Sequence, residues 1–283
     1  MTARFVLCAC AATVVAIVPM PTHAQSIGGC RFDTGTLRFA GTVQQTAACL
    51  LQKVRKRGSG SDAQEVPGWL QERMMTPVGF TAAQLQALAA SRGVELAEVT
   101  GTLAKGDASN VRYFVIHDTS SPEIQSASNE FPANIDLETY SGNRLTGWTG
   151  LPGRVNLLIN RAGRSRLTTD WHDSRTRPAT KIEQNSLVPA SRSLFVHVEN
   201  IQPRIKPQGT WAWVAPTPGL SAAQEERLAF AYIVASYRAG RWLIPAYHFN
   251  IDQGLPNGHD DPQNMDLASW VARIAALEAS LPR

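Results

Sequence analysis

One apolar segment, residues 111–120, has the sequence VRYFVIHDTS. Its β-branched and aromatic side chains predict a buried strand over residues 112–116. His117 follows directly, so its imidazole is expected to be held rigidly at the edge of a sheet. A histidine in that setting can ligate a metal ion, although a single strand histidine is more often a hydrogen-bonded residue of the core.

Further strands and helices are predicted on both sides of this segment. Apolar runs predict strands over residues 155–160, 194–199 and 242–249, and helix caps predict helices over residues 42–57, 81–92, 221–238 and from 266 onward. Strands mixed with helices indicate an α/β fold in which helices flank a central mixed β-sheet. Residues 203–218 are rich in proline and predict a long surface connection.

The first 25 residues predict a secretory signal peptide, because a positive residue precedes an apolar run, two prolines and a Thr22-His23-Ala24 cleavage motif. We expect a small, mostly helical N-terminal region over residues 26–107 and a catalytic domain over residues 108–283. The apolar run of the signal is too short to span a bilayer comfortably, and no other segment is long enough. The mature protein is thus expected to be exported, to the periplasm or beyond, and to be soluble.

Charge and cysteine content narrow the classes of partner. The formal net charge falls from +4 to +3 when Arg4 leaves with the signal, and the basic residues form no stripe that would indicate nucleic acid. Cys8 and Cys10 also leave with it. The remaining pair, Cys30 and Cys49, is expected to form a disulfide in an oxidising compartment, the alternative being two buried thiols.

A second histidine shares the setting of His117. His248 closes the apolar run of residues 241–247, and a turn-rich loop after it holds His259, Asp260 and Asp261. Two histidines at strand ends and one carboxylate match the three protein ligands of a catalytic zinc ion, which leaves one position for water. The inventory alone leaves open whether Asp261, Asp260 or His259 is the third ligand.

The ordered set of motifs resembles the zinc-dependent N-acetylmuramoyl-L-alanine amidases, the superfamily of the peptidoglycan recognition proteins. Those proteins have a V-I-H strand, a Y-L-I-D-R-D-G hairpin, a G-I-E strand, a second histidine and an Asp-Pro pair. This chain has the counterparts VIH (115–117), NLLINRAG (156–163), VHVE (196–199), His248 and Asp261-Pro262. The resemblance covers roughly residue 110 to the end, and the spacing from His248 to Asp261 is a few residues longer than usual.

The resemblance implies roles for individual residues. It makes His117, His248 and Asp261 the ligands of a Zn²⁺ ion, and it places His259 where a basic residue faces the reacting carbonyl oxygen. Glu199 corresponds to the carboxylate that orients the attacking water and takes its proton. Two further residues are noted. Glu183 is a second candidate for the acid–base role of Glu199, and His197 is expected to be hydrogen-bonded within the sheet.

The expected function is therefore an exported zinc hydrolase, an N-acetylmuramoyl-L-alanine amidase that acts on peptidoglycan or muropeptides. The alternatives are a peptidoglycan-binding protein without catalysis and another zinc peptidase of the cell wall, such as a D-alanyl carboxypeptidase. The sequence contains neither a Gly-x-Ser-x-Gly elbow nor a His-Glu-x-x-His motif, which disfavours a serine hydrolase and a helix-borne metalloprotease site.

Overall fold

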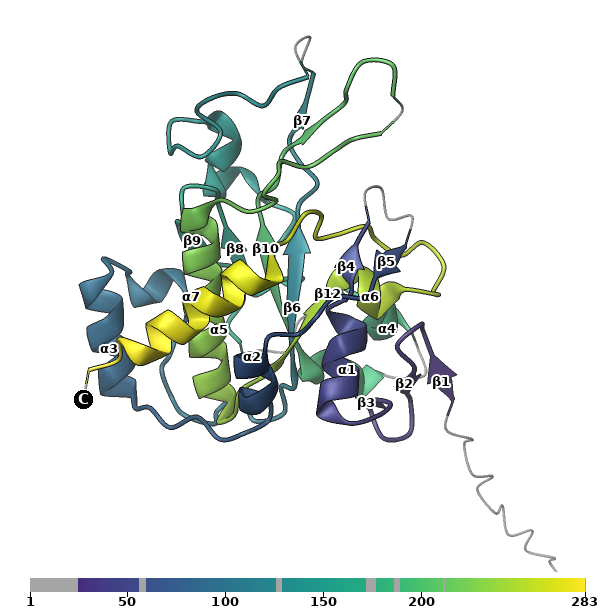
Figure 1. Cartoon of the computed structure of the whole chain (residues 1–283). Helices are drawn as coiled ribbons and strands as arrows, with labels where there is room; N and C mark the ends of the chain where they lie inside the picture. Colours follow the sequence, from purple (N-terminus) through teal and green to yellow (C-terminus); the bar gives the residue numbers. More distant parts are fainter. Residues whose placement is uncertain are drawn as a thin grey trace, which may run out of the picture.

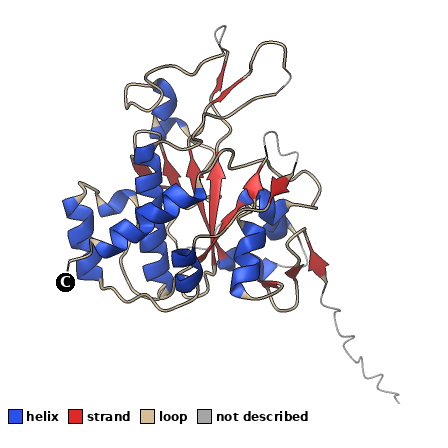
Figure 2. Ribbon diagram, viewed as in Figure 1, coloured by secondary structure: helices blue, strands red, loops and turns tan. Residues whose placement is uncertain are grey.

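The fold is built around a five-stranded sheet (Figures 1 and 2). A computed structural model describes residues 25–55, 60–125, 129–171, 177–185, 189–210 and 212–282, so the predicted signal peptide lies outside the described residues except for Gln25. The sheet has the order β12-β6-β10-β8-β9, in which β9 is antiparallel to β8 and the other neighbours are parallel. This mixed central sheet agrees with the predicted class. Its strands are β6 (Tyr113–Asp118), β8 (Leu157–Ile159), β9 (Ser165–Leu167), β10 (Phe195–Asn200) and β12 (Ile244–Tyr247).

Successive residues of β6 alternate between two covered faces. On one face Phe114 packs against Tyr232 of α5 (Ala222–Ala239) and Trp270 of α7 (Leu267–Ala279), with ring centroids 5.2 and 6.3 Å apart. Figure 1 shows these two helices lying across the sheet. On the other face the Tyr113 ring lies 5.1 Å from those of Phe39 and Phe195. The N-terminal region thus covers the face that α5 and α7 leave open.

The N-terminal region is less helical than the sequence predicts. It contains a small antiparallel sheet and a hairpin besides its helices, and its buried residues belong to the same hydrophobic core as the central sheet. The strands are β1 (Ser26–Ile27), β2 (Phe32–Asp33), β3 (Arg38–Phe39), β4 (Lys53–Val54) and β5 (Ser61–Asp62). The helices are α1 (Val43–Leu50), α2 (Gly68–Arg73), α3 (Ala82–Ser91) and the short 3-10 turn η2 (Leu96–Glu98).

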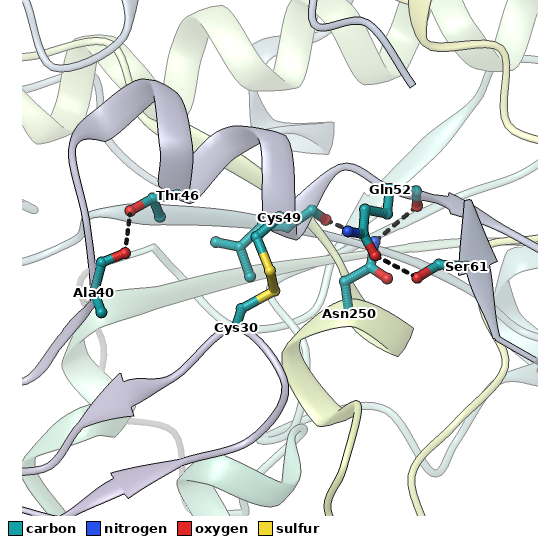
Figure 3. The surroundings of a disulfide bond; sticks show 8 residues. Cys30, Ala40, Thr46, Cys49, Gln52, Ser61 and Asn250 are labelled. Carbon is teal, nitrogen blue, oxygen red and sulfur yellow. Dashed lines mark hydrogen bonds between the residues drawn. A yellow bond between two sulfur atoms is a disulfide. The ribbon is translucent and has the colours of Figure 1, made fainter. Parts of the chain in front are cut away.

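Helix α1 ends earlier than residue 57, which corrects the predicted boundary. The Thr42–Gln45 capping box is present, but the chain leaves the helix after Leu50 and continues as β4. The carbonyl oxygens of Leu50 and Gln52 accept hydrogen bonds from the Asn250 side chain, at 3.0 and 2.8 Å (Figure 3). A tertiary contact therefore satisfies carbonyl groups that a longer helix would have used.

The predicted disulfide is confirmed. Cys30, in the turn between β1 and β2, is bonded to Cys49 near the end of α1 (Figure 3). The bond fastens the small sheet to α1. Because Asn250 holds the end of α1, the N-terminal region is also fastened to α6 (His248–Asp252).

The predicted strand over residues 242–249 is too long. Strand β12 ends at Tyr247, and residues 248–252 form α6. The backbone N–H of Phe249 donates to the carbonyl oxygen of Asp261 at 2.9 Å, so it bonds to a loop and not to a neighbouring strand. A short apolar run does not distinguish a buried strand from a buried helix.

The helices near the C-terminus begin and end close to the predicted positions. Ser221 caps α5 by accepting from the N–H of Gln224, and Gly240 ends the helix with a φ of 75°. Ser221 and Gln224 have the spacing of a capping box, but only half of it forms, because the Gln224 side chain donates to the carbonyl oxygens of Ile159 and Ile201. Asp266 caps α7 as predicted.

Short elements complete the described chain. The predicted connection over residues 203–218 includes β11 (Arg204–Ile205), which pairs with β7 (Glu123–Ile124). The others are α4 (Lys181–Gln184) and the 3-10 turns η3 (Ser141–Asn143), η4 (Leu145–Gly147) and η5 (Pro189–Leu194). Within the described residues, no helix combines the length and the apolar character needed to cross a bilayer.

Candidate metal centre

The carboxyl ends of three neighbouring parallel strands meet at one edge of the sheet. His117 lies near the end of β6 and pairs in register with Glu199 of β10, so their side chains leave the same face of the sheet. Strand β12 borders β6 on the other side, and His248 follows its last residue. Ligands of open α/β sheets commonly bind at the carboxyl ends of strands.

A loop after α6 brings Asp261 to the same edge. Its Oδ2 accepts a hydrogen bond from the N–H of Asp118 at 3.2 Å, and its carbonyl oxygen accepts from Phe249. Gln263 donates its N–H to a carboxylate oxygen of Asp118 at 2.9 Å. The loop is therefore bound to both β6 and α6, which fixes the position of the Asp261 carboxylate.

His117, His248 and Asp261 form a buried group in which the ligand atoms lie within 4.8 Å of one another. The Nδ1 atoms of the two histidines are 2.9 Å apart. The Asp261 carboxylate lies 3.1 Å from Nδ1 of His248 and 3.5 Å from Nδ1 of His117. These buried groups could hold a metal ion.

The spacing of the three donors fits a zinc ion. Tetrahedral ligands with bonds of about 2.0–2.1 Å are separated from one another by roughly 3.3–3.4 Å. With Oδ2 of Asp261 as the third donor, the three distances are 2.9, 3.2 and 3.5 Å, which lie on both sides of that value. Nitrogen and carboxylate donors are also the set that catalytic zinc sites use.

Each of these two imidazoles has a polar partner near its far nitrogen. Nε2 of His117 lies 2.8 Å from Nδ1 of His197, and Nε2 of His248 lies 3.0 Å from Oδ2 of Asp252. Partners of this kind orient the histidines of metal sites. The arrangement leaves Nδ1 of both rings facing the common centre.

Electrostatics at the centre favour a cation. Burial and the charge of His248 lower the pKa of His117 to about 4, so its ring is neutral. Burial opposes ionisation of Asp261, but the two histidines outweigh it and hold the pKa of that carboxyl below its ordinary value. Burial likewise disfavours the proton on His248, yet Asp261 and Asp252 raise the pKa of His248 well above its usual value. A divalent cation held by His117, His248 and Asp261 would take the place of the proton on Nδ1 of His248, beside the Asp261 carboxylate.

A cavity of about 220 Å³ opens beside these groups. Glu199 lines it together with His117, His248 and Asp261, and is 9% exposed. Burial, and after it the nearby charges of Asp261 and Asp118, raises the pKa of Glu199 well above its ordinary value. A buried carboxyl group of strongly shifted pKa that lines a cavity beside candidate ligands is a candidate acid–base group.

The residues that the sequence left as alternatives lie around this group. Asp260 lines the cavity, and its carboxylate accepts from the Gln263 side chain at 2.8 Å. The His259 ring stacks on His248, with centroids 4.3 Å apart, and its side chain is 49% exposed. His259 forms a second potential metal-binding group with His248 and Asp252, on the other edge of the His248 ring. Neither Asp260 nor His259 belongs to the group that contains His117.

Two further residues singled out by the sequence lie behind the candidate ligands. His197 is fully buried and contacts His117. Glu183, the reserve acid–base candidate, is not among the cavity-lining residues and lies 3.1 Å from His197.

The sequence interpretation missed Asp252, Asp118 and Arg204. Asp252 follows His248 by four residues, which is the spacing of one helical turn, but the apolar run that contains His248 predicts a strand that ends at residue 249. Arg204 donates to both carboxylate oxygens of Asp118 at 2.7 and 2.9 Å, deep in the protein. Burial raises the pKa of Asp118 to about 6 despite this arginine. Nothing in the sequence indicates this pair, which is distant along the chain.

Comparisons with protein-family models, with curated proteins and with solved structures find no match for this chain.

Proposed function

We propose that the protein is a zinc-dependent amide hydrolase in which His117, His248 and Asp261 hold the metal. The observation that carries the proposal is the convergence of these three donors beside a cavity that Glu199 lines. Three protein ligands leave one position of a tetrahedral ion for water or substrate. The ligand atoms come from two strand ends and a loop, so the fold must form before the donors meet.

The chain's own residues supply positioning and proton transfer. When bound, zinc polarises a carbonyl group and lowers the pKa of a water molecule to about 7. Glu199, whose raised pKa suits a group that both accepts and gives a proton, takes the proton of the attacking water and passes it to the departing amine. His259, at the exposed rim of the cavity, donates a hydrogen bond to the developing oxyanion.

The proposed substrate is the amide bond between N-acetylmuramic acid and L-alanine in peptidoglycan or its fragments. Support comes from the order of the motifs along the chain, VIH, NLLINRAG, VHVE, His248 and Asp261-Pro262. The Cys30–Cys49 disulfide is compatible with an exported protein, because disulfides persist mainly outside the reducing cytosol. We therefore propose that the enzyme acts in the periplasm or outside the cell.

A muropeptide assay tests the activity. The protein is incubated with purified muropeptides in three samples: as prepared, after a chelator, and after zinc is restored. We expect the protein to release peptides that begin with L-alanine. The chelator should stop this release, and added zinc should restore it. Release of D-alanine would instead identify a carboxypeptidase, and binding without cleavage would identify a recognition protein.

Metal analysis tests the ligand set. We expect His117→Ala, His248→Ala and Asp261→Asn to lose bound zinc, because each removes one of three donors. Asp260→Asn and His259→Ala are matched controls from the same cavity and should keep zinc close to one ion per chain. Zinc content is measured after dialysis, with circular dichroism to check folding.

Retention of zinc by His117→Ala would refute the site. Loss of zinc in His259→Ala with retention in Asp261→Asn would move the third ligand to His259.

A further inference from the structure

A buried chain of polar side chains runs from His117 away from the cavity. Nε2 of His117 lies 2.8 Å from Nδ1 of His197, and Nε2 of His197 lies 3.1 Å from Oε2 of Glu183. All three side chains are at most 4% exposed. We propose that Glu183 and His197 are positioning residues that hold His117 in the tautomer with its proton on Nε2, so that Nδ1 faces the metal; this rests on the proposed metal centre.

The fold fixes His197 independently of the metal. His197 lies two residues before Glu199 on β10, on the face of the sheet that also carries His117. Its backbone N–H donates to the Asn156 side chain at 2.9 Å, and the Phe195 ring lies 6.1 Å from its own. The ring is therefore held at the distance at which it can accept a hydrogen bond from His117.

Glu183 is held just as firmly. It is the third residue of α4, and its Oε2 accepts from the N–H and the hydroxyl of Thr180, both at 3.0 Å, within a capping box. An ionised carboxylate only accepts hydrogen bonds. Its charge therefore favours the proton of His197 on Nε2, although that ring is not aimed straight at the oxygen.

The consequence passes along the chain to the metal centre. With its proton on Nε2, His197 offers Nδ1 as an acceptor, and His117 can donate only from Nε2. The lone pair of His117 is then on Nδ1, the atom 2.9 Å from Nδ1 of His248 and 3.5 Å from Asp261. A neutral imidazole with its lone pair on that nitrogen is the form that binds zinc.

Helix α4 supports the second histidine ligand as well. The N–H of Lys181 donates to Oδ1 of Asp252 at 2.7 Å, and Oδ2 of Asp252 lies 3.0 Å from Nε2 of His248. One short helix thus holds the carboxylate groups behind both ligand imidazoles. The capping box that begins it would then serve the metal site as well as the helix.

Three variants separate positioning from a purely structural role. His197→Leu removes both ring nitrogens, His197→Asn keeps an acceptor near the place of Nδ1, and Glu183→Gln keeps the shape of the carboxylate without its charge. Tyr232→Phe is the control, because it removes a buried hydrogen bond of 2.6 Å to the Leu243 carbonyl on the opposite face of the sheet. All four are compared with the wild type as full-length mature chains.

Two readouts are used. The zinc dissociation constant is measured by competition with a chromophoric chelator, and nitrogen-15 NMR of the imidazole rings reports which nitrogen of His117 carries the proton. We expect His197→Leu to weaken zinc binding about 10–100-fold. His197→Asn should recover most of that loss, Glu183→Gln should give an intermediate loss with mixed tautomers, and Tyr232→Phe should leave the constant unchanged.

Wild-type zinc affinity in His197→Leu, or affinity as poor in His197→Asn as in His197→Leu, would overturn the proposal. If the leucine variant does not fold, Glu183→Gln decides, and unchanged tautomers there would overturn it. If the wild type binds no zinc, the proposed function fails separately, and the proton position on His117 in the metal-free protein still tests the chain: Nε2 supports it and Nδ1 overturns it. Zinc binding without amide cleavage would refute the amidase alone.

Discussion

The carboxyl group of Glu199 is buried near two other acidic groups, those of Asp118 and Asp261. Arg204 pairs with Asp118, and His248 pairs with Asp261. Burial and the charges of these two acids raise the pKa of Glu199 well above its ordinary value. The buried position of Glu199 therefore lowers the unfolding free energy at every pH at which this carboxyl group is ionised in the unfolded chain. The same environment suits it to proton exchange in the proposed reaction.

Glu199→Gln tests that cost in metal-free protein. The folded pKa is raised above the unfolded value of about 4.3, so the unfolding free energy of the wild type falls as the pH rises above that value. Glutamine does not ionise, so the variant should be more stable than the wild type by at least about 1 kcal/mol at pH 8 and nearly equal to it at pH 4. Urea unfolding at the two pH values measures the difference.

The exposed Glu72→Gln on α2 is the matched control, because it makes the same substitution at the surface. Glu199→Gln less stable than the wild type at pH 8 would contradict the raised pKa. In the muropeptide assay, Glu199→Gln should bind zinc but turn over about 10²–10⁴-fold more slowly.

At the scale of elements, the turn between β8 and β9 is packed against the start of α5. Gly163 in this turn has a φ of 79°, and a Cβ atom there would lie 2.8 Å from the carbonyl oxygen of Ala223. The Ser221 hydroxyl, which caps α5, also donates to the carbonyl oxygen of Arg161. The hairpin and the helix therefore position each other.

Gly163→Ala and Gly93→Ala separate this contact from backbone strain. Gly93 follows α3 with a φ of 61°, but it has nothing within 4 Å of an added Cβ atom. Gly93→Ala should lower the unfolding free energy by about 1–2 kcal/mol, the cost of a left-handed conformation. Gly163→Ala should lower it by a further 1–3 kcal/mol or so, because the added methyl group meets backbone.

Thermal unfolding of the two variants beside the wild type gives the comparison. If Gly163→Ala and Gly93→Ala lose the same unfolding free energy, the turn between β8 and β9 can move away from α5 without a loss of stability.

At the scale of the whole molecule, the N-terminal region is part of the structure that positions the candidate metal centre. The Cys30–Cys49 bond fastens the small sheet to α1, and Asn250 of α6 holds the end of α1 (Figure 3). Helix α6 begins with His248. The N-terminal region is therefore connected to His248, a candidate ligand, through the disulfide, α1 and Asn250.

Removal of the disulfide should destabilise the protein. The cysteines are 19 residues apart, and a loop of that size contributes about 3 kcal/mol by limiting the unfolded chain. We expect Cys30→Ala/Cys49→Ala to lose about that much unfolding free energy in urea. Wild-type protein kept in reductant is the matched control and should show a similar loss, whereas an unchanged midpoint in both would contradict the expectation.

Local signals were sufficient for much of the fold. The VRYFVI run predicted β6, and the Thr42, Thr81 and Asp266 caps predicted where three helices begin. Such patterns depend on residues within one or two turns of each other, so the sequence displays them directly. Boundaries failed where a distant side chain intervened, as Asn250 does at the end of α1.

The sequence by itself determined the strand that carries His117, the helix caps, the disulfide partners and the inventory of histidines and carboxylates. Only the tertiary structure decided that β12 and β10 lie on either side of β6, that His248 begins a helix, and that Glu183 and Asp252 lie behind the candidate ligands. The physical reason is that a metal centre depends on strand order and register. Those are set by packing between β6 and strands that are 82 and 131 residues away along the chain, and no local pattern records them.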